Sequence, residues 1–265
     1  MRLTDFSTVL FDAVNLCGYD LSNITEQQFR TVRQFANQRL RIAWESFPWF
    51  SLTRFAEVSV TVDAITGLRT VAIPAGSGEV VGVYSKNPLT TTQAVYVSYA
   101  LTDIVNLAVS VDGVETIVIN SPISSVWVEY RVRRPELHGE VWSAAVTYRA
   151  GAQVYFDSSS GTGSLMPTAG FAHTANFYTA SVTLPIGTKP IFVGGGDARW
   201  IKIQIPYMFA SYISRAVYAD FLRSEQQYED AGKADIDASA VLEQEYDKEL
   251  RQQGQIRRIN FIDTY

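Results

Sequence analysis

Between Tyr207 and Gly254 the chain has no proline, and its only glycine there is Gly232. Such a long stretch without helix breakers strongly constrains the fold, because these two residue types interrupt helices most effectively. Apolar residues recur along it at three-to-four-residue spacing, with charged residues between them, as expected for amphipathic helices. We therefore predict two helices, over residues 207–228 and 234–252, separated at Gly232.

The end of the chain, residues 254–265, forms a short tail with an unusual composition. It is too short to fold alone, and it is too apolar and aromatic to remain a simple solvated segment. We predict that it is a docking arm that folds on a partner. The residues expected to make the contact are Arg251, Ile256, Arg257, Arg258, Ile259, Phe261, Ile262 and Tyr265.

Two helices are also predicted at the N-terminal end. Residues 4–17 have the pattern of a short amphipathic helix capped by Thr4 or Asp5. The second helix begins at Thr25, which has capping-box spacing to Gln28, and ends before Pro48.

The pattern changes to strict alternation of apolar and polar residues at Phe55. Residues 55–135 contain several such runs, including Val126–Val132, and they predict an antiparallel β domain. Asp112–Gly113 is typical of a tight hairpin turn between two of the strands. Residues 140–203 are rich in Gly, Ser, Thr and Tyr with short β runs, and predict a separate small β domain.

The order of these patterns predicts an α+β fold. We expect the N- and C-terminal helices, residues 1–54 and 204–253, to form a helical bundle with the antiparallel β segments inserted between them. Residues 254–265 would extend from this bundle as the arm.

Bulk properties limit the possible environments and partners. The chain has 265 residues, of which 47% are hydrophobic, and a formal net charge of −5, so no overall basic character points to nucleic acid. Cys17 is the single cysteine, which excludes an internal disulfide and fits synthesis in cytoplasm. We find no signal-peptide pattern and no apolar run long enough to cross a membrane.

Residues that commonly perform catalysis or bind metals are sparse. The two histidines, His138 and His173, have no histidine, cysteine or acidic partner at metal-ligand spacing. Gly194–Asp197 lacks the lysine and hydroxyl residue that complete a phosphate-binding loop, and no nucleophile-elbow motif occurs. We therefore expect no enzymatic activity, metal or cofactor.

Residues 142–203 contain a recognisable series of motifs, namely Trp142, Tyr148-Arg149-Ala150-Gly151, Val154-Tyr155, Tyr178-Thr179-Ala180, Pro190 and Trp200. In these motifs the segment resembles the small chitin- and cellulose-binding modules of the 5/12 type. It implies glycan contact through exposed aromatic faces, with Trp142, Tyr155, Tyr178 and Trp200 as candidates. The chain departs from the pattern at Ala152, where an acid is usual, and at Ser181–Leu184, where exposed aromatics often occur. The alternative interpretation is that the aromatics form the core of a β module without sugar binding.

The two ends of the chain combine a long N-terminal helix followed by a β insertion, the stretch Ala216–Gln226, and a charged helix that ends at Arg251–Gln255. In these features the chain resembles the head-to-tail connector (adaptor or gatekeeper) proteins of tailed bacteriophages. It implies a ring, commonly of twelve copies, that joins the portal protein to the next tail or nozzle component in the neck of the virion. Double-stranded DNA would pass through the ring without sequence-specific binding, and the C-terminal arm would reach the portal.

The sequence is also compatible with two other functions. The first is a carbohydrate-binding surface protein that uses residues 142–203. The second is a tail-tip or baseplate component that carries the same module.

Overall fold

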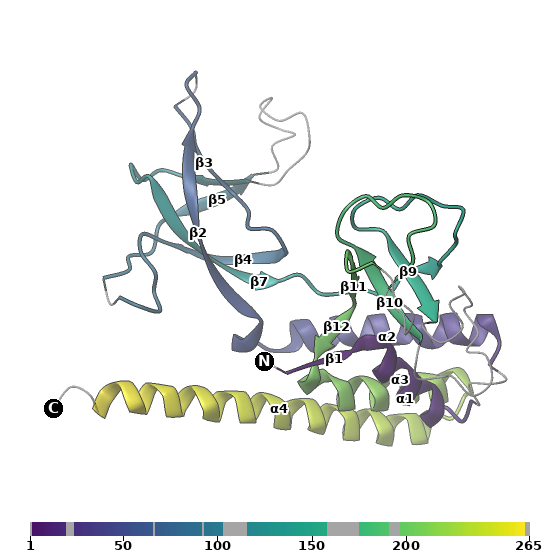
Figure 1. Ribbon diagram of the computed structural model, residues 1–265. Coiled ribbons are helices and arrows are strands. Elements are labelled where there is room, and N and C mark those ends of the chain that lie inside the picture. The colour runs from purple at the N-terminus through teal and green to yellow at the C-terminus, as the bar shows by residue number, and fades with distance from the viewer. Residues whose placement is uncertain are drawn as a thin grey trace. The chain divides into compact units, whose positions relative to one another are not determined.

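The computed structural model describes residues 2–19, 24–65, 67–91, 93–102, 116–157, 175–190 and 197–262. For Glu26, Thr102, Asp157, Ala175 and residues 253–262 it describes the backbone alone. The described chain has an α+β fold with four α-helices and three sheets (Figure 1). It divides into two compact units, one made of residues 1–48 and 135–265 and the other of residues 49–134.

Residues 49–134 form a six-stranded antiparallel sheet in the order β4-β7-β2-β3-β6-β5. Its elements are the short 3₁₀ helix η1 (Phe50–Leu52), β2 (Thr53–Val62), β3 (Arg69–Ala72), β4 (Ser77–Tyr84), β5 (Tyr99–Thr102), β6 (Thr116–Ile119) and β7 (Ser125–Val132). The predicted hairpin at Asp112–Gly113 lies outside the described residues.

This sheet closes on itself into a small barrel. The segment before β5 pairs with the end of β4, since Val97 N donates to Val83 O at 2.8 Å and Ser85 N donates to Val95 O at 2.9 Å. Alternate residues along the strands point inward, as the period of two requires. The barrel's buried hydrophobic cluster consists of Val71, Val80, Val83, Val97, Ile117, Ile119, Val126 and Val128, with partly buried side chains such as Tyr99 packed against it. The barrel therefore contains a core of its own.

The other unit holds all four α-helices. They are α1 (Phe6–Leu16), α2 (Glu26–Ser46), α3 (Ala210–Ser224), which follows the 3₁₀ helix η3 (Tyr207–Phe209), and α4 (Tyr228–Ile262). Helix α3 packs against each of the other three, which explains why it has buried residues on more than one face, including Ile213, Ala216 and Val217. Helices from both ends of the sequence thus share one core.

The two predicted helix N-caps differ in whether their side chains form a capping hydrogen bond. The capping box is confirmed, because Thr25 Oγ1 accepts from Gln28 N while Gln28 Oε1 accepts from Thr25 N. Asp5 is the N-cap of α1, but its side chain makes no capping hydrogen bond. Asp5 instead accepts hydrogen bonds from Lys202 and Gln204. It belongs to β1 (Leu3–Asp5), which pairs with β12 (Gln204–Pro206) and ties the N-terminus to the segment before α3.

The small β segment forms a four-stranded sheet in the order β11-β10-β9-β8. These strands are β8 (Glu140–Val141), β9 (Gln153–Asp157), β10 (Ala175–Ala180) and β11 (Trp200–Lys202). Tyr155 and Phe177 meet at 4.8 Å between ring centroids, and Tyr155 also contacts Phe29 of α2 at 5.7 Å. Because aromatic packing joins this sheet to α2, it forms one compact unit with the helices rather than the separate domain that composition predicted.

The break between α3 and α4 lies at Glu225–Gln227, and the predicted break at Gly232 is wrong. Gln226 has φ = 63°, in the left-handed region. Gln227 N donates to Leu222 O and Gln226 N donates to Arg223 O, which is the hydrogen-bond pattern of a Schellman C-cap. Helix α4 then runs through both Gly232 and Gly254, since a single glycine costs a helix only about 1 kcal/mol and packing can offset that cost.

Candidate interaction surfaces of the helical unit

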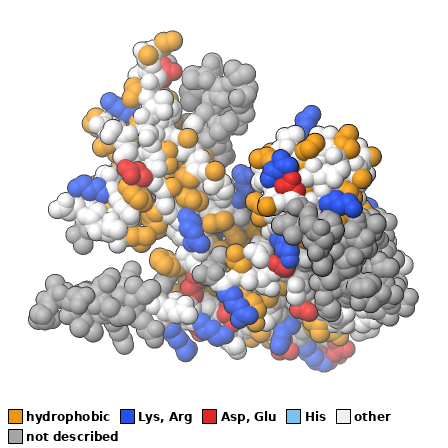
Figure 2. Space-filling model, in the orientation of Figure 1, with side chains coloured by type: hydrophobic (Ala, Val, Ile, Leu, Met, Phe, Trp, Pro, Cys, Tyr) orange, Lys and Arg blue, Asp and Glu red, His pale blue; other side chains and the backbone are white. Residues whose placement is uncertain are grey.

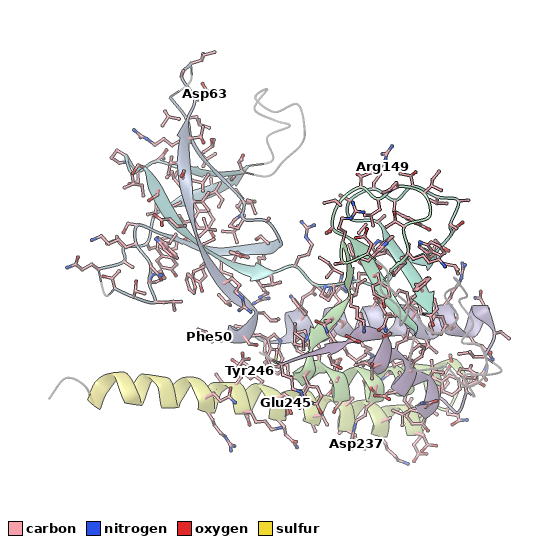
Figure 3. All side chains as sticks on the ribbon, viewed as in Figure 1. Phe50, Asp63, Arg149, Asp237, Glu245 and Tyr246 are labelled. Carbon is pink, nitrogen blue, oxygen red and sulfur yellow. The ribbon has the colours of Figure 1, made fainter. Side chains whose placement is uncertain are left out.

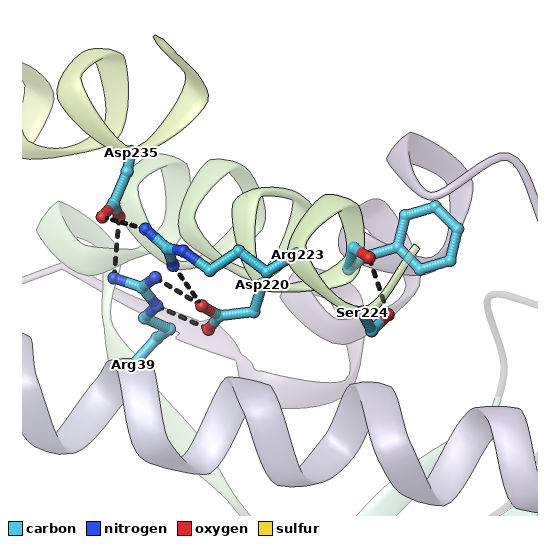
Figure 4. Close-up of polar contacts among 6 residues, drawn as sticks. Arg39, Asp220, Arg223, Ser224 and Asp235 are labelled. Atoms are coloured by element: carbon cyan, nitrogen blue, oxygen red, sulfur yellow. Dashed lines mark hydrogen bonds and ion pairs between the residues drawn. The ribbon is translucent and has the colours of Figure 1, made fainter. Parts of the chain in front are cut away.

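Helix α4 is anchored at its N-terminal half by a network of two arginines and two aspartates (Figure 4). Arg39 of α2 donates two hydrogen bonds to Asp220 of α3, from Nε at 2.6 Å and from Nη2 at 2.5 Å. Arg223 donates to Asp220 at 2.7 Å and to Asp235 of α4 at 2.6 Å. Arg39 Nη1 also lies 2.9 Å from Asp235 Oδ1, a contact that is an ion pair rather than a hydrogen bond.

The network is partly shielded from water. The side chains of Arg39 and Asp220 are 10% and 16% exposed. Burial disfavours the charged guanidinium of Arg39, but hydrogen bonding to Asp220 and the charges of Asp220 and Asp235 outweigh burial and raise its pKa. Arg39 therefore stays charged, and α4 is held to α2 and α3 by charge-assisted contacts.

A second contact holds α4 farther along its length. The ring of Tyr246 stacks on Phe47 with centroids 4.4 Å apart and an interplanar angle of 11°. Between the two contacts, Ala238 and Leu242 are buried. Beyond Tyr246, which is labelled in Figure 3, Leu250, Arg251 and Gln252 are exposed.

The residues of the predicted docking arm lie on the last part of this helix. The structure places the backbone of Arg251 through Ile262 on α4, so the arm is continuous with the anchored helix. It describes the side chain of Arg251, which is exposed. The side chains of Ile256, Arg257, Arg258, Ile259, Phe261 and Ile262, and the whole of Tyr265, lie outside the described residues. How these side chains are arranged therefore stays a prediction.

The candidate glycan-binding residues are buried, whereas sugar binding requires exposed aromatic faces. Trp142, Tyr155, Tyr178 and Trp200 are between 0% and 6% exposed. The indole nitrogens of Trp142 and Trp200 both donate to the carbonyl oxygen of Thr188, at 3.1 and 3.2 Å. These four side chains are core residues and present no free aromatic face to a glycan, which corrects their assignment as a contact surface.

An open groove of about 680 Å³ lies between α1, α3 and α4. Asp12, Asn15 and Leu16 of α1 line one side, and Ala234 and Asp237 of α4 line another. Ser211, Ser214, Arg215 and Tyr218 of α3 line the remainder. The groove thus combines two carboxylates and one guanidinium with apolar surface from Leu16, which is 48% exposed.

Sequence patterns did not predict this groove. Asp12, Arg215 and Asp237 each look like a residue on the solvated face of an amphipathic helix. Only the packing of α1 and α4 against α3 brings them together. On the face seen in Figure 2, acidic and basic side chains are interspersed over the helices, so charge type alone gives no signal for the groove.

Comparison with known proteins gives no family assignment. No protein-family model matches the chain, and a search of curated proteins finds no match. Within the described parts of the chain, no helix has the length and apolarity needed to cross a membrane. Among these same residues, no group of three or more His, Cys, Asp or Glu side chains is placed to hold a metal ion.

Proposed function

We propose that this chain is a structural virion protein, a head-to-tail adaptor without catalytic activity. Its copies would form a ring of twelve in the neck of the virion, after synthesis in the host cytoplasm. The ring would join the portal protein to the next tail or nozzle protein and surround part of the passage for double-stranded DNA.

The observation that carries this proposal is that α4 is anchored up to Tyr246 and then continues for several more turns. The anchored part is fastened by the Arg39 and Arg223 network and by the Phe47–Tyr246 stack. The remaining part continues to Ile262 and carries an apolar and basic sequence. A rigid base with an attached docking segment suits a protein that links two components, because the base orients the segment before it binds.

The arrangement of the helices supports the bundle that the proposal requires. The other three pack around α3, and the four come from both ends of the sequence. In the proposed ring these helices form a bundle that makes the contacts between copies, and the barrel and the small β sheet are insertions that decorate it. The acidic net charge of −5 suits a conduit, since mild repulsion keeps DNA from adhering.

The test is attachment to a purified portal ring. We expect the full chain to co-sediment with the portal and to form a ring visible by negative-stain electron microscopy. Deletion of residues 254–265 should abolish attachment and leave the melting temperature nearly unchanged, because the anchoring contacts described above lie at Tyr246 and before it.

A control variant separates a specific docking contact from a general effect of truncation. Ile259→Asp with Phe261→Asp keeps the length of the arm and should also prevent attachment, whereas Lys248→Gln, in the exposed part before the arm, should not. Normal attachment of the truncated chain, or no ring on the portal, would contradict the proposal.

A further inference from the structure

The groove between α1, α3 and α4 has the size and accessibility of a binding site. Its volume of about 680 Å³ lies within the range typical of ligand sites, and it is open to solvent. Its sides come from two helices that each pack on α3. A groove flanked by two helices is a common acceptor for a further amphipathic helix.

The chemistry of the groove indicates what it accepts. Asp12 and Asp237 line the groove from different helices, and Arg215 of α3 also lines it. Two carboxylates against one guanidinium leave a net negative charge. Leu16, Tyr218 and Ala234 add apolar surface. The complementary occupant is therefore a segment that is both basic and apolar.

One segment of this chain has that composition. Residues 251–262 contain Arg251, Arg257 and Arg258 with Ile256, Ile259, Phe261 and Ile262, and no acidic residue. Its backbone is helical as the last part of α4. A helix-in-groove contact would set its arginines against the two carboxylates and its apolar side chains against Leu16 and Tyr218.

The segment cannot reach the groove of its own chain. Ala234 and Asp237, which line the groove, lie near the start of α4, and α4 is one continuous helix to Ile262. At 1.5 Å per residue, Ile256 stands about 30 Å farther along the axis than Asp237. The occupant must therefore come from another molecule.

We infer that this groove receives the C-terminal segment, residues 251–262, of a second copy of the chain. Each copy then gives one segment and accepts another through a different surface. Such a heterologous contact repeats from copy to copy, and it closes into a ring where the rotation between copies permits. The inference rests on the self-assembly in the proposed function and deepens it: the portal and the neighbouring copy compete for the same segment.

The first experiment measures self-association of the full chain by sedimentation velocity at low ionic strength. We expect concentration-dependent oligomers. Asp237→Arg should weaken the association about tenfold or more, because it reverses a charge in the groove. Glu243→Arg makes the same charge change on an exposed residue of α4 that does not line the groove, and it should leave the association unchanged.

The second experiment measures the contact directly. A fluorescent peptide of residues 250–265 is titrated into the chain that lacks residues 254–265, and the anisotropy is followed. We expect saturable binding that weakens with salt and is lost in the Asp237→Arg form of that chain. A peptide with Arg257→Glu and Arg258→Glu should bind poorly to the original groove and regain binding to the Asp237→Arg groove.

These results separate the inference from the proposed function. Asp237→Arg keeps its arm, so it should still attach to the portal. If the peptide binds the groove and no variant of the chain attaches to a portal, the adaptor role is wrong and the inference stands. If the chain stays monomeric and the peptide does not bind, or if Asp237→Arg and Glu243→Arg behave alike, the inference is overturned.

Discussion

At the scale of single residues, Arg39 is the side chain on which the arrangement of three helices depends. It is 10% exposed, yet it is charged, and a charge in such a position is tolerated only when it is paired. Asp220 of α3 accepts two hydrogen bonds from Arg39, and Asp235 of α4 forms an ion pair with it. Arg39 therefore fixes the direction in which α4 leaves the core.

Replacing Asp220 by Asn tests this role. The substitution keeps the shape of the side chain and removes its charge, which leaves the guanidinium of Arg39 only partly paired in a shielded position. We expect the free energy of unfolding, from urea titration, to fall by about 2–3 kcal/mol.

The control for Asp220→Asn is the variant Glu229→Gln. It breaks the exposed ion pair between Glu229 and Lys233. Water screens that pair, so no measurable loss of stability is expected. Equal losses for the two variants would show that the buried network contributes no more than a surface ion pair.

At the scale of elements, the turn between α3 and α4 determines where the longest helix begins. The Schellman C-cap at Gln226 ends α3 and lets α4 begin at Tyr228. Helix α4 has 35 residues and is therefore about 52 Å long, and the fastening contacts described above lie at Tyr246 or before it. The helix is thus both part of the core and a carrier for the docking segment.

Two substitutions test where the helix break lies. Gln226→Gly should raise the free energy of unfolding by about 0.5–1 kcal/mol, because glycine adopts the left-handed conformation without strain. Gly232→Ala should also raise it by about 0.5–1 kcal/mol, since alanine favours a helix interior and a Cβ at Gly232 meets nothing within 4 Å. A loss of stability in Gly232→Ala would instead place the break at Gly232. Thermal and urea unfolding provide the measurement.

At the scale of the whole molecule, the chain consists of two units that each have a core of their own. The barrel core is built only from residues of the barrel, and its sheet is closed by pairing between its own strands. The hydrophobic core of the barrel therefore consists only of residues from the barrel itself.

This independence predicts that residues 49–134 fold when they are expressed alone. We expect a dispersed amide NMR spectrum and a single cooperative thermal transition. Val126→Ala should lower the melting temperature of the fragment, because it removes buried methyl groups from the closed core. Loss of cooperative unfolding in the fragment would mean that the barrel depends on the rest of the chain.

Local sequence patterns determined most of the elements of this protein and only part of their arrangement. The capping box at Thr25, the alternation in β7 and the helical periodicity of α3 depend on residues close in sequence, so each could be predicted. The position of the α3–α4 break could not, because Gln226 is held in an unfavourable conformation by the packing of both helices. Burial of Trp142 and Trp200, closure of the barrel, and the groove between Asp12 and Asp237 were decided by tertiary structure alone. Each depends on residues distant in sequence, whose proximity no local pattern records.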